Sequence, residues 1–156
     1  PKSKLTEIQD WIRYRQKKYR IPNYRCIVDE DGVGGGVVDN CDIKGFVNNS
    51  TPFNGENYQN LQAQCGYKLA EHINGSDVGI DEDLVSGAER EDIIRQLEQL
   101  QTWKVDDDGT LKIKPKEEIK SEIGCSPDWR DLFLMRSWFD YNEYEIPDDI
   151  ERRLGL

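Results

Sequence analysis

The sequence lacks the short motifs that would assign it to several common functional classes. Its four cysteines form no Cys-x-x-Cys pair and there is a single histidine, so these residues make a poor set of zinc ligands. No GxxxxGK motif followed by Ser or Thr occurs, and this chain therefore contains no Walker-type ATPase. We expect its cysteines to be reduced, mostly packed thiols; they are Cys26, Cys41, Cys65 and Cys125.

Long apolar runs are absent as well. No stretch approaches the roughly 20 apolar residues that a membrane-spanning helix needs, and residues 1–20 are too polar and charged for a signal peptide. We therefore expect a cytosolic protein without membrane contact. The 156 residues fit a single domain, residues 1–156, and its last part, residues 141–156, has the composition of a polar tail.

The chain also lacks an overall excess of positive charge. Its net charge is −10, but residues 1–25 carry +6 and the remainder carries −16. The acidic balance argues against a general nucleic-acid binder, although metal ions that neutralise carboxylates let an acidic chain bind a polyanion locally. We interpret the early basic cluster as the solvent side of a helix; it consists of Arg13, Arg15, Lys17, Lys18 and Arg20.

What is present predicts an α/β fold. Apolar residues recur at helical spacing at 4–19, at 58–73, from about 89, and from 126 to about 141. Strand patterns occur at 24–29 and 42–47, with a short helix expected between them. Residues 102–116 predict a β-hairpin around an Asp-Gly turn. This order predicts helices packed against a small, partly parallel sheet, plus a β-hairpin.

The stretch "YRCIVDEDGVGGGVVDN", residues 24–40, is the first candidate site. Asp29 ends the expected strand, where open α/β sheets place their ligand sites. Glu30 and Asp31 follow it, and the nearby glycines, Gly32 and Gly34 among them, allow a ligand to approach the backbone closely. The alternative is a plain acidic turn that caps a strand.

The stretch "SPDWRDLFLMRSWF" is the second candidate site. Asp128 and Asp131 are three residues apart on the expected helix, on the face that also holds Leu132 and Met135. Both carboxylates should therefore point inward, where a divalent cation is a natural partner. An interaction with the helix dipole explains Asp128 alone and leaves Asp131 unexplained.

Four lysines are candidates for contact with DNA. Strand alternation places Lys112 and Lys114 on one face of the expected hairpin, and Lys116 follows in phase. Lys44, near the second strand, is a weaker candidate for contact with a phosphate group. The alternative is a solvated hairpin face.

Several motifs resemble the nuclease domain of tailed-phage large terminase subunits, which has a ribonuclease H-like fold. These are "IVDEDGVGGGVVD", "KGFVNN", "NYQNLQAQCGYKLAEHI" and "SPDWRDLFLMR", and the resemblance spans about residues 3–140. It implies hydrolysis of phosphodiester bonds with two Mg²⁺ or Mn²⁺ ions. Asp29, Asp128 and Asp131 would be the catalytic metal ligands, with Glu30, Asp31, Gly32 and Gly34 supporting them.

The resemblance also implies partners and a departure from the family. The partners would be double-stranded DNA, the portal protein, the small terminase subunit and the ATPase domain of the intact protein, in the host bacterial cytoplasm during phage assembly. Family members have an earlier strand with the first catalytic aspartate, before the helix with which this sequence begins. We therefore expect an N-terminally truncated fold that cuts DNA weakly or not at all.

Two other interpretations remain open. One is a different ribonuclease H-like nuclease, such as a Holliday-junction resolvase. The other is a non-catalytic acidic module that docks on a partner such as a portal ring. The last interpretation predicts that Asp29 and Asp128 lie far apart, whereas a nuclease requires their carboxylates to converge.

Overall fold

The structure is a computed structural model that describes residues 4–31 and 34–141. The α-helices of the described residues are α1 (Lys4–Tyr19), α2 (Gly35–Cys41), α3 (Leu61–Asn74), α4 (Gly87–Leu97), α5 (Lys116–Ile123) and α6 (Asp128–Ser137). The strands are β1 (Ile27–Asp29), β2 (Lys44–Phe46), β3 (Thr102–Trp103) and β4 (Lys112–Ile113). The predicted polar tail lies outside the described residues, apart from Tyr141.

The strands form two small sheets. β1 and β2 pair in parallel, with Val28 opposite Gly45, and α2 makes the crossover between them. β3 and β4 pair antiparallel, as the hairpin signal predicted, although only two residues of each strand pair. The predicted α/β class with a partly parallel sheet is therefore confirmed.

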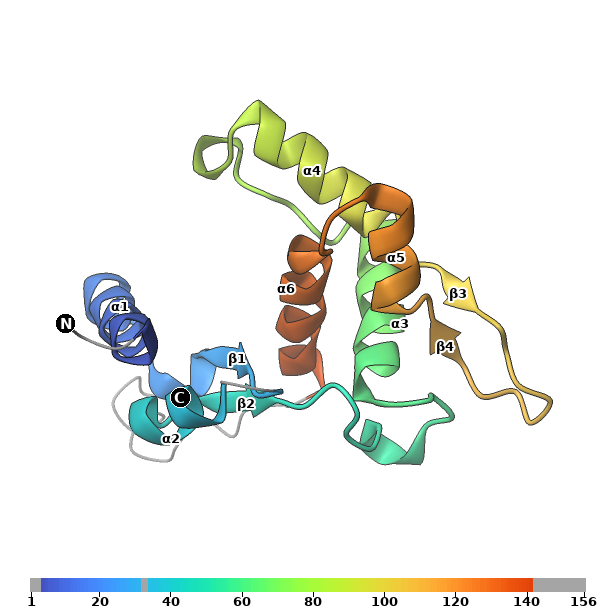
Figure 1. Cartoon of the computed structure of the whole chain (residues 1–156), viewed down its shortest axis with the longest axis horizontal. Coiled ribbons are helices and arrows are strands. Elements are labelled where there is room, and N and C mark those ends of the chain that lie inside the picture. The colour runs from blue at the N-terminus through green and yellow to red at the C-terminus, as the bar shows by residue number, and fades with distance from the viewer. Residues whose placement is uncertain (1–3, 32–33, 142–156) are drawn as a thin grey trace, which may run out of the picture.

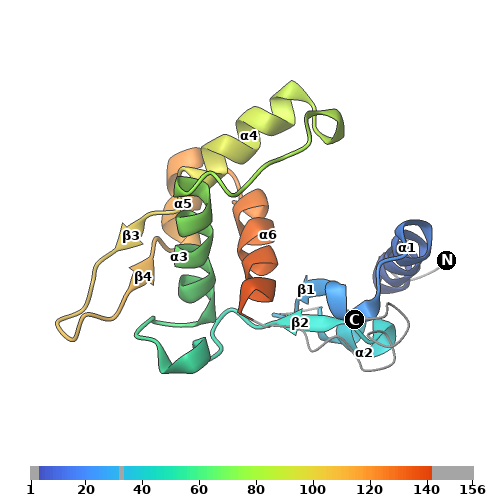
Figure 2. The ribbon, with the colours of Figure 1, turned by 180° about the vertical axis from the view of Figure 1, so that it is seen from behind.

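The main core lies between α3, α6 and β2. In Figures 1 and 2, α3 and α6 run side by side, and α4 lies across one end of the pair. Near that end α5 lies beside α3, and the β3–β4 hairpin lies on the side of α3 that faces away from α1. The buried residues of the main core are Phe46, Leu61, Ala63, Cys65, Leu69, Ile113 and Leu134. Burial raises the pKa of the Cys65 thiol to about 12, so this thiol stays protonated.

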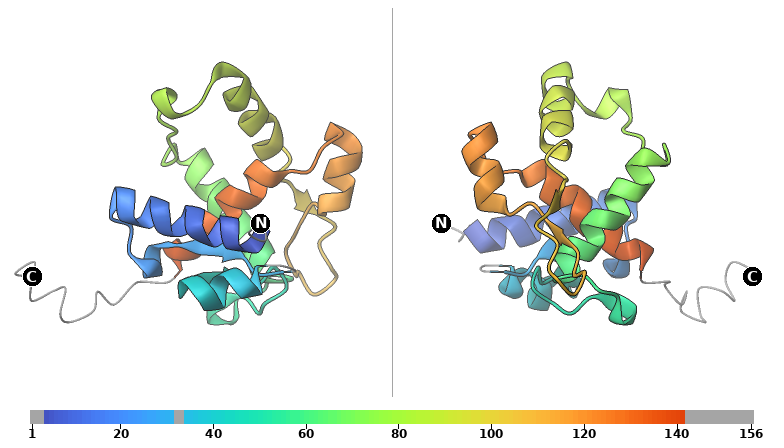
Figure 3. Two further views of the ribbon diagram at one scale, coloured as in Figure 1. Left: turned by 60° about the vertical axis from the view of Figure 1, so that its left-hand side comes forward. Right: turned by 90° about the vertical axis from the view of Figure 1, so that its right-hand side faces the viewer.

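A separate small core joins α1 to α2 and to the other face of β1. It consists of Val37, Cys41 and Ile43, with Leu5, Ile12, Cys26 and Val28 packed around them. Figure 3 shows α1, β1 and α2 as one group beside the end of α6. β1 therefore separates the two cores, because Ile27 packs on the main core and Val28 on the small core.

Two local predictions were wrong. Lys116 does not continue the hairpin strand, because Pro115 ends the extended segment and α5 begins after it. The final helix, expected from 126 to about 141, is shorter: α6 covers Asp128–Ser137, and its N-cap residue, Pro127, makes no side-chain cap bond. No helix among the described residues is both long enough and apolar enough to cross a membrane.

Candidate functional site

Asp29 lies at the end of β1 and is exposed to solvent. Its Oδ1 accepts a hydrogen bond from the backbone N–H of Asp31 at 3.0 Å, which forms a tight turn after the strand. The backbone N–H of Glu30 donates to the carbonyl oxygen of Phe46 at 2.9 Å and extends the pairing with β2 by one bond. No ion pair between described residues includes Asp29, so its carboxylate is available to a ligand.

The acid–glycine turn needs glycine at Gly34 for a steric reason. A Cβ on Gly34 would lie 1.7 Å from the carbonyl oxygen of Asp29, so only glycine lets α2 start this close to the strand end. At Gly45 on β2 a Cβ would lie 1.8 Å from Oε2 of Glu30, but this is the end of a flexible side chain that can move aside. The close approach that the sequence predicted is thus made by the chain's own atoms, while Gly32 lies outside the described residues.

Asp31 fixes this turn to the end of β2. Its Oδ2 accepts hydrogen bonds from the backbone N–H of Asn48 at 3.0 Å and from Nδ2 of the same residue at 2.7 Å. Asp31 therefore supports the position of Asp29 by joining the turn to the neighbouring strand end. The supporting role of Asp31 in a metal site stays a prediction.

Asp131 lies in an ionic cluster between β4, α5 and α6. Its Oδ2 lies 2.6 Å from Nζ of Lys116, and its Oδ1 accepts hydrogen bonds from Nη2 of Arg130 at 2.8 Å and from Nε at 3.1 Å. Arg130 is completely buried, and its Nη1 donates to the carbonyl oxygen of Lys114 at 3.1 Å. Asp131 therefore neutralises a buried guanidinium group, which explains its position without a metal.

Asp128 does not point inward, and that expectation was wrong. Its side chain is 81% exposed, and Oδ1 accepts a hydrogen bond from Oγ of Ser126 at 2.6 Å. Leu132, assigned to the same inward face, is 50% exposed, because the buried face of α6 is formed by Arg130, Leu134 and Ser137. Asp128 and Asp131 still meet at Lys116, whose Nζ lies 3.9 Å from Oδ1 of Asp128.

The carboxylates fit divalent cations by type but not by arrangement. Carboxylate oxygens are the ligands that Mg²⁺ and Mn²⁺ prefer. Yet no group of three or more His, Cys, Asp or Glu side chains within residues 4–31 and 34–141 could hold a metal ion. Both oxygens of Asp131 already have cationic partners. The assignment of Asp29, Asp128 and Asp131 as metal ligands therefore stays a prediction.

The lysines of the hairpin do not form the expected row. Lys112 pairs with Asp106, with Nζ 2.6 Å from Oδ1, and Lys116 pairs with Asp131. Lys114 is 4% exposed and contacts Glu122 and Gln99, so it cannot reach a phosphate group in this arrangement. Lys44 is exposed on β2.

The sequence reasoning missed both α5 and the role of Arg130. Signals for α5 were present: Glu117 and Glu118 follow Pro115 in the first turn, and Gly124 ends the helix with φ of 75°. Its apolar pattern is short, which concealed it. Arg130 carried a weaker signal, since it stands directly beside Asp131 in the sequence, where the two opposite charges can pair.

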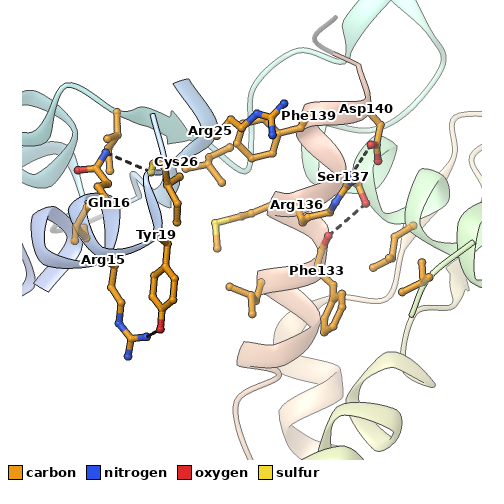
Figure 4. Close-up of a pocket in the computed structure, with 18 of the residues that line it drawn as sticks. Arg15, Gln16, Tyr19, Arg25, Cys26, Phe133, Arg136, Ser137, Phe139 and Asp140 are labelled. Carbon is orange, nitrogen blue, oxygen red and sulfur yellow. Dashed lines mark hydrogen bonds and ion pairs between the residues drawn. The ribbon is translucent and has the colours of Figure 1, made fainter. Parts of the chain in front are cut away.

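A groove of about 950 Å³ lies between α1 and α6. Figure 4 shows Tyr19 and Cys26 on one side of it and Phe133 and Arg136 on the other. Its apolar walls are formed by Trp11, Ile12, Tyr19, Cys26, Ile27, Leu132, Phe133 and Met135.

Comparison with known proteins identifies the fold. No protein-family model and no curated protein sequence matches this chain. Its structure is similar to the nuclease domain of the large terminase subunit gp2 of bacterial virus Sf6, with a TM-score of 0.63 and 20% sequence identity. The match covers 83% of this chain and 70% of that one. The resemblance to terminase nuclease domains that the sequence predicted is therefore confirmed at the level of the fold.

Proposed function

We propose that this chain is part of the nuclease domain of a viral DNA-packaging terminase large subunit, a metal-dependent endonuclease that cuts concatemeric double-stranded DNA. The observation that carries the proposal is the likeness to the Sf6 terminase nuclease domain over 83% of the chain. Asp29 adds support, because it is an exposed carboxylate at the end of a parallel strand, held in place by a glycine-dependent turn.

The proposed cofactors are two Mg²⁺ or Mn²⁺ ions, which supply Lewis-acid chemistry when bound. The described carboxylates do not accommodate them in their present arrangement, because Asp131 is already paired with Lys116 and Arg130. We assign Asp29 and Asp128, which are exposed, to the intact catalytic site. The chain alone is expected to cut DNA weakly or not at all.

An incomplete sheet supports this view of the fold. The backbone groups of Cys26 and Glu30 bond to β2. Because alternate residues direct their backbone groups to opposite edges of a strand, those of Ile27 and Asp29 face the other edge of β1, where no described backbone group pairs with them. A two-stranded parallel sheet is rarely stable alone. We propose that the missing strands of a ribonuclease H-like sheet occupy this edge and the groove beside it.

Exposed apolar side chains beside this edge support the same proposal. Trp11 on α1 is 56% exposed and Leu132 on α6 is 50% exposed, and both line the groove. A strand placed between them would be covered on both faces, as the strands of parallel sheets are. The residues of such a strand would be nearly all apolar, and it would bring the further carboxylate that the site requires.

The partners and location follow from the proposed function. We propose that the intact protein acts on double-stranded DNA with its own ATPase domain, a portal protein and a small terminase subunit, in the cytoplasm of a host bacterium during phage assembly.

The direct experiment is a plasmid-cleavage assay with Mn²⁺ on this chain and on a chain extended at its N-terminus. We expect cleavage by the extended chain only, abolished by Asp29→Asn and by Asp128→Asn. Cleavage that survives in both variants would show that the wrong acids were chosen. Cleavage of four-way junctions in preference to linear duplex DNA would favour a resolvase.

One observation favours the non-catalytic alternative. Asp131 is satisfied by cations of the protein itself, so the acids on α6 have a structural explanation. Calorimetric titration of Mn²⁺ into the extended chain distinguishes a nuclease from a non-catalytic interaction module. Heat that disappears in the Asp29→Asn, Asp128→Asn double variant supports the nuclease site, whereas an extended chain that takes up no Mn²⁺ supports the interaction module.

A further inference from the structure

One face of α1 carries exposed aromatic rings and cations in alternation. Trp11, Tyr14 and Tyr19 are 56%, 59% and 53% exposed. The Arg15 guanidinium carbon lies 4.8 Å from the ring centroid of Trp11 and 5.8 Å from that of Tyr19. Nζ of Lys18 lies 5.1 Å from the ring centroid of Tyr19 and 6.0 Å from that of Tyr14. These five residues are called the α1 ladder below.

The rings of the α1 ladder hold its cations in place. Nη1 of Arg15 donates a hydrogen bond to the Tyr19 hydroxyl oxygen at 3.4 Å, and Lys18 and then Arg15 lower the pKa of that hydroxyl. Contact with an aromatic face restricts a long cationic side chain without neutralising it. No ion pair between described residues includes Arg15 or Lys18, whereas Lys112, Lys114 and Lys116 all pair with carboxylates.

The charge of the surroundings determines which partner this face fits. Residues 1–25 have a net charge of +6, and the rest of the chain has −16. The ladder lies at the end of the molecule away from the β3–β4 hairpin (Figure 1). A polyanion is therefore attracted to α1 and repelled elsewhere.

We propose that the α1 ladder is a binding surface for the phosphate backbone of double-stranded DNA. Its cations lie over its ring faces, so those faces are not free to stack on bases as the sites for single strands require. Charges that are already ordered suit phosphate contacts, which position a duplex without reading its sequence. Because the choice of DNA as the polyanion rests on the proposed nuclease function, the test must separate binding from cleavage.

The α1 ladder is compatible with a filled groove. Trp11, Arg15 and Tyr19 line the groove between α1 and α6, whereas Tyr14 and Lys18 do not. A strand in the groove would cover one side of the ladder and leave Lys18 and Tyr14 facing outward. Lys18 and Tyr14 therefore stay accessible in the proposed extended chain, whereas this chain, with its groove open, exposes the whole ladder.

The experiment is fluorescence anisotropy of a labelled duplex of about 30 base pairs, in EDTA, over a range of salt concentrations. The Arg15→Gln, Lys18→Gln variant is compared with the Arg90→Gln, Lys104→Gln variant. The control removes the same charge from exposed positions, one of which, Lys104, also lies over an aromatic ring. We expect the α1 variant to bind at least about tenfold more weakly and to lose about 2 from the slope of log affinity against log salt, while the control changes little.

Three results would overturn the proposal: no duplex binding by the unaltered chain at low salt, unchanged binding by the α1 variant, or equal weakening in the control. A Trp11→Leu, Tyr19→Leu variant keeps both charges; if the rings order the cations, it weakens binding about threefold and leaves the salt slope unchanged. Because EDTA removes divalent ions, these results do not depend on catalysis. Failure of the nuclease proposal would instead appear as absent Mn²⁺-dependent cleavage by the extended chain.

Discussion

The body built around α3 and α6 differs from the unit made of α1, β1 and α2 in how completely each covers its apolar surface. The first has an extended core, capped helices and an internal ionic cluster. The second has the small core alone, and its helix α1 carries four of the large exposed apolar side chains: Ile8, Trp11, Tyr14 and Tyr19. Six other large exposed apolar side chains among the described residues lie outside this unit, Leu132 of α6 among them, so the smaller α1 unit carries more of them for its size.

This difference predicts a hierarchy of stability. Regions with few buried apolar contacts open at lower free energy than a well-packed core. Amide hydrogen exchange should therefore be slower in α3 and α6 than in α1. The functional features follow the same division, because Asp29, the groove and the α1 ladder all belong to or border the less covered unit.

The largest expected effect comes from breaking the main core. Leu134→Ala removes a 1% exposed side chain and should lower the free energy of unfolding by about 4 kcal/mol, through lost burial and the cavity left behind. Urea unfolding followed by circular dichroism measures the change. Leu84→Ala, at a 78% exposed position, is the control and should change little. A cost below about 1 kcal/mol for Leu134→Ala would mean that the main core is not the stable part.

The next effect comes from the ionic cluster. Arg130→Met should lower the free energy of unfolding by about 3 kcal/mol. The mostly buried carboxylate of Asp131 then keeps only one of its two cationic partners, Lys116. Adding Asp131→Leu should restore part of the loss, since the unpaired charge is then removed. Urea unfolding of the single and double variants tests this. A double variant no more stable than Arg130→Met would contradict the pairing.

A substitution at Lys116 tests whether the carboxylates on α6 belong to a metal site, and its expected effect is smaller. Its ammonium group lies beside Asp131 and near Asp128, where a divalent cation would compete with it. If these acids belong to a metal site, Lys116→Met should raise the affinity for Mn²⁺ about tenfold, which corresponds to about 1.4 kcal/mol. Calorimetric titration measures the affinity. Lys120→Met, at another partly exposed lysine on α5, is the control; an equal gain there would point to net charge instead of this site.

The elements that the sequence predicted well are those set by local spacing. The helix expected over 4–19 has the bounds of α1, because its apolar residues recur at helical intervals without interruption. The inward face of α6 could not be predicted, because Arg130 is buried through contacts with Lys114 and Asp131 that depend on tertiary structure. The groove depends on the separation of α1 and α6, which no spacing in the sequence encodes.

The smallest expected effect lies at the start of α4, where a local hydrogen-bond pattern supplies the stability. Oγ of Ser86 accepts a bond from the Glu89 N–H at 3.3 Å, and Oε2 of Glu89 accepts one from the Ser86 N–H at 2.8 Å. Ser86→Ala should cost about 1 kcal/mol.

Oε2 of Glu89 also accepts a hydrogen bond from Oγ of Ser86 at 2.7 Å, and the pKa of Glu89 is lowered in the folded chain, chiefly by the Ser86 N–H and then by this hydroxyl. A lowered pKa means that this contribution is present at neutral pH and is lost as the pH falls below about 5. The difference between the unaltered chain and Ser86→Ala, measured by urea unfolding, should therefore shrink between about pH 5 and pH 3. Because Ser86→Ala keeps the backbone N–H, a difference that stays constant over this range would show that the Ser86 hydroxyl does not stabilise the Glu89 carboxylate. Because this cap lies on the body and far from α1, hydrogen exchange in α1 should be the same in both proteins.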